Sequence, residues 1–314
     1  MNVPLQGKWF DMTKGSVATL ALFLAYVTLP LAGTLPGLFV PLPAIFYSIK
    51  NGGANGAAIV AVSAAILAAV TGPATALLYI LQCGIISLAL AVCLDKGMGG
   101  ARAIASAVAL DIAVILLLAA AYSLSQGVDI HQQVVTGINS SISQTAALYE
   151  KSGLSGDELH ALQQVLRQGG DMVTRVYPAL VTIGLSLIAG INLLSVRRLY
   201  ARLSRPLPIG DFWGFRNPEW LIWVLIAAGF AMLLDHRAIT GTALNVLIVT
   251  LSLYFVQGLA VIGSFFDRLT VPVILRWIFY LFLAVQPYLA VAVAALGVFD
   301  LWGDFRTPKP RENL

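Results

Sequence analysis

Charged residues are scarce in this sequence of 314 residues. Lysine, arginine, aspartate and glutamate make up 11% of the chain and 59% of it is hydrophobic, whereas an ordinary globular protein carries roughly 25% charged residues. The 34 charges (19 basic and 15 acidic) are too few to cover the surface of a soluble monomer of this size. The composition therefore excludes a soluble globular protein, a disordered chain and a nucleic-acid-binding domain.

Cysteine is nearly absent as well, and the sequence has no catalytic or metal-binding motif. Cys83 and Cys93 are ten residues apart in one apolar run, a helical rise of about 15 Å that no disulfide can bridge. The sequence contains no CxxC, HExxH, GxSxG or phosphate-binding-loop pattern, the common signatures of metal, hydrolytic and nucleotide chemistry. We therefore expect a protein that is not an enzyme and that holds neither a metal nor a cofactor.

Long apolar runs are what the sequence does have. A helix needs about 20 residues to cross a bilayer, and nine segments are candidates: 16–34, 37–49, 57–71, 74–94, 102–123, 174–196, 218–234, 241–263 and 273–299. The second contains Pro41 and Pro43 and would rise only about 20 Å as a straight helix, so we expect a broken or short segment there. The pattern predicts an all-α polytopic transmembrane helical bundle of eight or nine spans.

The distribution of lysine and arginine predicts the orientation, because these residues concentrate in cytoplasmic loops. With the N-terminus in the cytoplasm, 12 of them face inside and seven outside, and five arginines between positions 197 and 216 contribute most to the difference. The cytoplasmic membrane is then the expected location and the lipid bilayer the first partner. If segment 37–49 only dips into the bilayer, the later spans invert, so the side on which the C-terminus lies stays open.

Two polar segments divide the chain into a six-span bundle, 1–196, and a part with three further spans and a short tail, 218–314. The segment 124–172 is expected to be a polar loop with one short amphipathic helix, because SGDE at 155–158 has capping-box spacing. This helix would lie on the membrane surface or over the mouth of a cavity. The basic and aromatic loop 197–217 is typical of a cytoplasmic headgroup anchor.

Asp111 is the one ionisable residue near the middle of a strong apolar segment. Ionisable groups inside the hydrocarbon are costly, and each is a candidate for function. Two interpretations stay open. The carboxyl either contacts a ligand or an ion inside the bundle, or it is a neutral acid that hydrogen-bonds to a neighbouring helix.

Softer polar positions add to the candidate ligand-binding residues. Amides inside spans either contact a ligand or hydrogen-bond between helices, and tyrosines either stack on a planar ligand or belong to the interfacial belt. The candidates of these kinds are Gln82, Asn192 and Tyr79. Prolines and glycines interrupt the helical pattern early in the chain, and broken segments often line the binding sites of transporters. Pro41, Pro43 and Asn51 are therefore candidates too.

Several short stretches together carry a family resemblance. They are Pro-Leu-Pro at 41–43 with a glycine-rich step after it, Tyr-Pro-Ala-Leu at 177–180, Tyr-Phe-Val-Gln-Gly-Leu-Ala at 254–260, and Leu-Gly-Val-Phe-Asp at 296–300 with Arg306. In this layout the chain resembles the YybS-like family of bacterial membrane proteins over nearly its whole length. The resemblance implies a bacterial inner-membrane protein and no catalytic residue.

More distantly, residues 16–196 are similar to the substrate-binding S components of energy-coupling factor vitamin transporters, which have six membrane helices and cytoplasmic termini. The first helix of those proteins often meets the coupling subunit through an Ala-x-x-x-Ala face, and Ala21 and Ala25 match this pattern. The resemblance implies a membrane partner subunit and a separate ATPase module. The long segment 124–172 and the three extra spans depart from the family, and no vitamin-pocket motif matches, which leaves the ligand open.

Two functions from different classes follow. The chain either binds or takes up a vitamin- or metabolite-like small molecule between its first six spans, or it is a membrane scaffold for an envelope or biosynthetic assembly, similar in architecture to the shape-determining MreD proteins. A scaffold would bind its partner through the basic loop, with candidate contacts Arg197, Arg198 and Arg202. Proton-coupled transport through Asp111 has less support, because the acid has no relay. The sequence narrowly favours binding or uptake.

Overall fold

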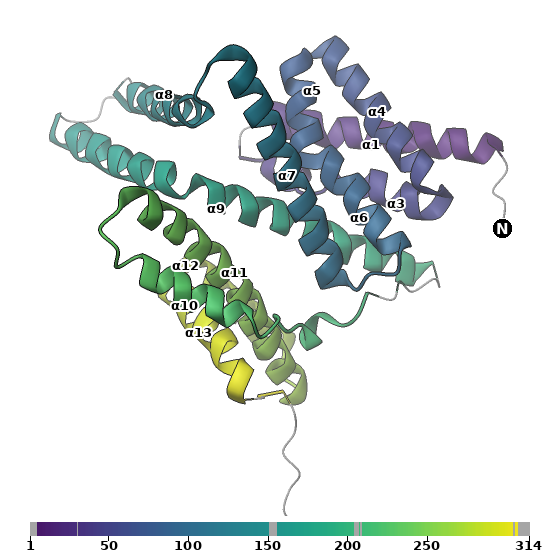
Figure 1. Cartoon of the computed structure of the whole chain (residues 1–314). Coiled ribbons are helices and arrows are strands. Elements are labelled where there is room, and N and C mark those ends of the chain that lie inside the picture. The colour runs from purple at the N-terminus through teal and green to yellow at the C-terminus, as the bar shows by residue number, and fades with distance from the viewer. Residues whose placement is uncertain are drawn as a thin grey trace, which may run out of the picture. The chain divides into compact units, whose positions relative to one another are not determined.

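The computed structural model describes residues 5–29, 31–150, 156–203, 207, 209–303 and 305–306, and these residues are helical almost throughout (Figure 1). No β-strand occurs among them, which confirms the all-α prediction. The elements are α1 (Leu5–Thr28), α2 (Thr34–Gly37), α3 (Leu42–Asn51), α4 (Gly53–Val70), α5 (Pro73–Tyr79), the π-helical turn η1 (Ile80–Gly84), α6 (Ile85–Asp95), α7 (Gly100–Gln126), α8 (Ile130–Glu150), α9 (Gly156–Arg202), the 3₁₀ turn η2 (Phe212–Gly214), α10 (Leu221–Ala231), α11 (Arg237–Arg268), α12 (Val273–Val285) and α13 (Pro287–Gly303).

Five helices of the described chain are long and apolar enough to cross a membrane: α4, the run Pro73–Asp95 from α5 through η1 to α6, α7, α9 and α11. Helices α12 and α13 would add a sixth span if they act together, although they are bent by 109° at their junction. Helix α10, at the predicted span 218–234, has only 11 residues. The multi-helical membrane character is shown, whereas the count of eight or nine spans is not confirmed.

The bend between α12 and α13 divides the single span expected at 273–299 into two helices. Pro287 has no amide hydrogen, so it cannot continue the helix that precedes it. The residue before a proline favours extended backbone, and Gln286 adopts it, with φ −107° and ψ 101°. The two residues therefore separate two helices instead of producing a mild kink.

The segment 124–172, expected to be a polar loop, is largely helical. Helix α8 occupies residues 130–150, and α9 begins at Gly156 and continues for 47 residues into the predicted span 174–196. Ser155, the expected cap residue, lies outside the described residues. Leu159, Leu162 and Leu166, which follow the expected cap at three- and four-residue spacing, thus belong to the first turns of a long helix.

Helix α9 passes through Pro178 with help from a side chain of α11. Proline cannot donate a hydrogen bond, and its ring disturbs the backbone of the preceding turn. The Asn245 Oδ1 accepts a hydrogen bond from the Ala179 amide at 2.9 Å, and the Asn245 Nδ2 donates to the Arg175 carbonyl oxygen at 2.8 Å. The amide of Asn245 therefore partners backbone groups on both sides of the proline, as expected for a polar residue that bonds between helices.

The three arginines proposed as a docking surface do not lie in a loop. Arg197, Arg198 and Arg202 lie in the last turns of α9, because the helix ends only at position 202. The connection that follows is held by a backbone hydrogen bond of 3.1 Å, in which the Gly100 amide donates to the Ile209 carbonyl oxygen.

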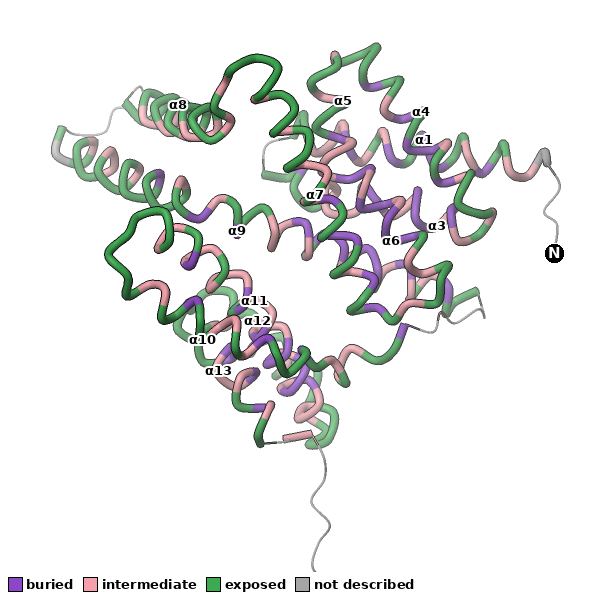
Figure 2. The backbone as a smooth tube through the Cα atoms, in the orientation of Figure 1, coloured by how far each residue is buried: buried purple, intermediate pink, exposed green. Residues whose placement is uncertain are grey.

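The chain forms two compact units. Unit 1 consists of Met1–Ile130 and Thr182–Gly210, and unit 2 of His131–Val181 and Asp211–Leu314, so α9 contributes residues to both. Buried positions in unit 1 concentrate on α1, α3, α4, α6, α7 and the C-terminal part of α9 (Figure 2). Those in unit 2 concentrate on α11 and α13. The domain boundaries expected from the sequence stay a prediction.

Candidate functional site

Asp111 lies inside unit 1 with no partner for its carboxyl group. Its side chain is on α7, where Ala103, Ala107 and Asp111 recur every fourth residue on the buried face. The exposed fraction of Asp111 is 0%, and neither of its oxygens has a hydrogen-bond partner among the described residues. Buried polar groups in proteins are almost always hydrogen-bonded. The described residues thus show no hydrogen bond of the kind that the second interpretation of Asp111 expects, and the missing partner calls for an explanation.

The packing of α6 against α7 locates what faces Asp111. Leu90 shares a buried cluster with Ala103 and Ala107, and Ile86 shares the next one with Val108. The two helices therefore run in opposite directions, and one further turn along them brings Cys83 to the level of Asp111. The thiol of Cys83 is buried and within electrostatic range of the Asp111 carboxyl.

The backbone opposite Asp111 is irregular. Residues Ile80–Gly84 form the π-helical turn η1, and the amide of Ile85 donates to the Ile80 carbonyl oxygen five residues earlier. The hydroxyl of Ser87 donates to the Cys83 carbonyl oxygen at 2.6 Å. A π-helical turn inserted in an α-helix costs regular hydrogen bonding and frequently marks a functional site. The turn and the unpartnered acid therefore form one candidate site, which we call the Asp111 site: Asp111, Cys83, Ser87 and η1.

The structure brings Asn192 and the broken proline segment together. The Asn192 Nδ2 donates to the Leu38 carbonyl oxygen and to the Ile188 carbonyl oxygen, both at 2.7 Å. Pro41 directly precedes α3. Because proline has no amide hydrogen, it interrupts the backbone hydrogen bonding between α2 and α3. Asn192 thus supplies a donor to a carbonyl of the interrupted backbone, while its own Oδ1 is buried without a partner.

Replacing Asn192 with leucine is expected to destabilise unit 1 by about 1–3 kcal/mol, because the Leu38 carbonyl oxygen would lose a buried donor. Ser195→Ala on the same helix is the control, since the Ser195 hydroxyl donates to the Ile191 carbonyl within α9. Thermal unfolding of the purified chain measures the effect, with amide exchange of α3 as the local readout. A leucine variant as stable as the control would contradict this structural role.

The remaining ligand candidates occupy different surroundings. Tyr79 is 1% exposed and packs edge-to-face on Phe23, with ring centroids 5.3 Å apart, so it is a core residue. Gln82, in η1, donates to the Tyr26 hydroxyl at 3.3 Å. Pro41 and Pro43 begin α3, and Asn51 ends it. Only Gln82, through η1, belongs with the Asp111 site.

Asn51 instead belongs to an ion-pair cluster that the sequence did not predict. The Asp11 Oδ2 accepts hydrogen bonds from Lys50 Nζ at 2.7 Å and from Asn51 Nδ2 at 2.9 Å. Burial raises the pKa of the Asp11 carboxyl, but these hydrogen bonds and the charge of Lys50 outweigh it, and the net pKa lies below the usual value. The cluster joins α1 to the end of α3. The opposite charges of Asp11 and Lys50 were the only sign of it in the sequence.

The partner-binding candidates lie on the outside of unit 1. Ala21 is exposed and Ala25 is half-buried on α1. Arg198 and Arg202 are exposed on the last turns of α9, while Arg197 is half-buried. Because these side chains are at least partly accessible, a partner-binding surface at these residues stays a prediction.

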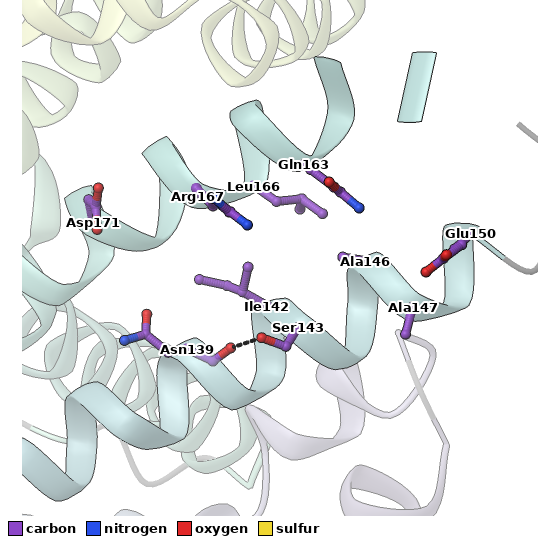
Figure 3. A pocket seen from close by; sticks show the side chains of 10 residues that line it. All are labelled: Asn139, Ile142, Ser143, Ala146, Ala147, Glu150, Gln163, Leu166, Arg167 and Asp171. Carbon is purple, nitrogen blue, oxygen red and sulfur yellow. Dashed lines mark hydrogen bonds between the residues drawn. The ribbon is translucent and has the colours of Figure 1, made fainter. Parts of the chain in front are cut away.

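Unit 2 contains a separate groove between α8 and the first turns of α9 (Figure 3). Its volume is about 470 Å³, and Ile142 and Leu166 point toward each other across it. Its polar rim carries Glu150, Arg167 and Asp171, all exposed. A groove with an exposed rim and no buried unpartnered group has less claim to a ligand than the Asp111 site.

The described residues contain no group of three histidine, cysteine, aspartate or glutamate side chains that could hold a metal ion. A family model described as a predicted membrane protein (DUF2232) matches residues 17–301. Neither a curated protein nor a solved structure matches the chain.

Proposed function

We propose, from the premise that the chain belongs to the DUF2232 family of predicted membrane proteins, that it is a non-enzymatic protein that binds a small molecule within unit 1 and serves its uptake. The observation that carries this proposal is the Asp111 carboxyl, wholly buried with both oxygens unpartnered. Leaving a buried polar group without a partner costs about 1–3 kcal/mol. Such a cost at an intramembrane acid favours a ligand as the missing partner.

The surroundings of the acid support binding rather than chemistry. The Asp111 site offers one carboxyl, one buried thiol, one hydroxyl and the backbone of η1. No histidine or second carboxyl joins them among the residues named for the site, so a proton relay has no second member. Energy for uptake would come from a separate ATPase module, which makes a membrane partner subunit part of the proposal.

Native mass spectrometry of the protein, extracted gently from its own membranes, tests this function. We expect a reproducible added mass of a small molecule on the wild type and its loss in Asp111→Asn. The matched control is Asp11→Asn, which changes the paired acid of the same unit and should keep the added mass. Wild-type protein without added mass, or Asp111→Asn that retains it, would overturn the proposed function.

The same spectra address the scaffold alternative. A stoichiometric second polypeptide on otherwise ligand-free protein would support a scaffold at an envelope or biosynthetic assembly. Reversing the charges of Arg198 and Arg202, which are exposed at the end of α9, should then remove that polypeptide. We also propose that the protein lies in the inner membrane with a cytoplasmic N-terminus, a proposal supported by the positive-inside distribution of lysine and arginine.

A further inference from the structure

We propose that the group recognised at Asp111 is a monovalent cation, either an alkali metal ion or the ammonium group of an organic ligand. This inference rests on the proposed function and deepens it, because it names the chemistry of the ligand. It follows from two independent features of unit 1: the charge balance at Asp111 and the kind of polar atom that the interior leaves unpartnered.

No described basic residue pairs with the Asp111 carboxyl. The Asp111 carboxyl accepts no hydrogen bond from any described side chain or backbone group. The basic residue nearest to it on α7 is Arg102, which is exposed and about 13 Å away along the helix axis. Buried charges in proteins are paired or bind an ion. In its ionised form Asp111 would be neutralised by one positive charge, which favours a monovalent cation over a divalent one.

The unpartnered polar atoms of unit 1 are all oxygens. The buried side-chain atoms without a hydrogen-bond partner in its described part are the hydroxyls of Ser16, Thr19 and Ser63, the amide oxygens of Asn51, Asn55, Gln82 and Asn192, and both carboxyl oxygens of Asp111. No N–H donor is among them. Six of these nine atoms are amide or carboxyl oxygens, and the three hydroxyls can accept as well as donate. The described interior therefore has an excess of acceptors, which a cation would partner.

The orientation of the amide groups is fixed by their partners. Asn192 Nδ2 faces two carbonyl oxygens and Asn55 Nδ2 faces the Lys8 carbonyl oxygen at 3.1 Å. A carbonyl oxygen cannot donate, so these amides cannot turn their nitrogen toward the free side. The excess of acceptors is thus a property of the packing.

Of these oxygens, the Gln82 Oε1 belongs to η1, the π-helical turn of the Asp111 site. Gln82 and Cys83 are adjacent in η1, and Cys83 faces Asp111. Carboxylate, amide and backbone oxygens are hard ligands for metal cations, and carbonyl oxygens coordinate alkali ions in channel filters. The same oxygens accept hydrogen bonds from an ammonium group. Both sources of positive charge therefore share one recognition chemistry.

Thermal unfolding of the full chain in detergent, at constant ionic strength and with chloride as the anion, tests the proposal. The probes are sodium and methylammonium, and tetraethylammonium is the control because it carries the charge without an N–H and is too bulky for a packed interior. At a hundredfold excess over Kd we expect the wild-type Tm to rise by about 5 °C. A rise with sodium alone identifies an alkali ion, and a rise with methylammonium alone identifies an ammonium group.

The variants make the outcome decisive. Asp111→Asn should lose the rise, and Asp11→Asn should keep it; if Asp111→Asn does not fold, Asp111→Val, which removes both polar atoms, takes its place. No rise with either probe, or an equal rise in the Asp111 variants, would overturn the cation proposal. A small molecule retained in native spectra without any cation response would sink this inference alone, whereas the absence of any bound molecule would sink the proposed function.

Discussion

Substituting alanine for Arg306 is expected to destabilise unit 2 by about 3–5 kcal/mol, because the substitution leaves Asp300 buried without its ion-pair partner. The Arg306 Nη2 and the Asp300 Oδ2 are 2.6 Å apart, and their side chains are 9% and 0% exposed. The Arg306 Nη1 also donates to the carbonyl oxygens of Trp213 and Phe215, at 2.9 and 2.7 Å. One side chain therefore serves three acceptors from two separate segments.

The effect extends beyond the pair, because Asp300 is part of a buried hydrogen-bond network. Gln257 Nε2 donates to the same Asp300 Oδ2 at 2.9 Å, and Gln257 Oε1 accepts from the Asn217 amide at 2.9 Å. The side chain of Asn217 donates to the Leu253 carbonyl oxygen, also at 2.9 Å. Networks of this kind lose more than one bond when a charged member is removed.

Thermal unfolding of the purified chain measures the loss, and hydrogen exchange of the Asn217 amide reports it locally. The control is the double variant Asp300→Asn with Arg306→Met. Removing both charges should recover part of the stability that the single variant loses, because no uncompensated charge is left. An Arg306→Ala variant within 0.5 kcal/mol of wild type, a threshold of roughly the spread seen for neutral surface changes, would contradict the assignment of a buried ion pair.

The helices themselves could be predicted from the sequence, since apolar runs and the few charges between them define α4, α7 and α11. The prediction that Asp111 faces the interior also followed, because an exposed acid in a long apolar run would face lipid. The turn η1 could not be predicted. The residues Ile80–Gly84 have the same local preference for an α-helix as their neighbours, so the sequence gives no sign of a π-helical turn there. The turn is found only in the three-dimensional structure.

The hydrogen-bond partners of Asn192 and Asn245 could not be predicted from the sequence for a different reason. Asn192 and Asn245 each bond to backbone that a proline has interrupted, Asn192 at Leu38 and Asn245 beside Pro178. The sequence separation of these contacts is 154 and 66 residues. The sequence indicates only that a buried amide side chain needs a hydrogen-bond partner. Which backbone group lacks its usual helical partner depends on the three-dimensional path of the chain.

The ion pair of Asp300 and Arg306 could not be predicted from the sequence either. The sequence placed Arg306 in a polar tail and Asp300 at the end of the last apolar run, with no reason to pair them. Their pairing depends on the carbonyl oxygens of η2 and its neighbours, which have no signature in composition or spacing. Asp300 and Arg306, two of the residues that carry the family resemblance, thus stabilise the fold of unit 2.

Gly297→Ala is expected to disrupt the crossing of α11 and α13 and to destabilise unit 2 by about 3 kcal/mol, at the upper end of the usual cost of overpacking. A Cβ atom at Gly297 would lie against the carbonyl oxygen of Tyr254 and 2.8 Å from the amide nitrogen of Gly258. A Cβ at Gly258 would in turn meet the backbone carbonyl of Val293. Backbone cannot move aside as a flexible side chain can, so the helices would have to separate.

The two glycines act as a pair, each receiving the backbone of the other helix, and close approach through small residues is how membrane helices associate without a hydrophobic driving force. Gly241→Ala is the matched control on α11, because a Cβ there meets nothing within 4 Å. Alanine in place of an unobstructed helical glycine should raise stability by up to about 1 kcal/mol. Opposite signs for Gly297→Ala and Gly241→Ala in thermal unfolding would therefore separate helix crossing from helix propensity, and equal signs would contradict the crossing. Separation of the helices would also carry Tyr254 and Gln257 away from α13, so Gly297→Ala should increase exchange of the Asn217 amide as Arg306→Ala does.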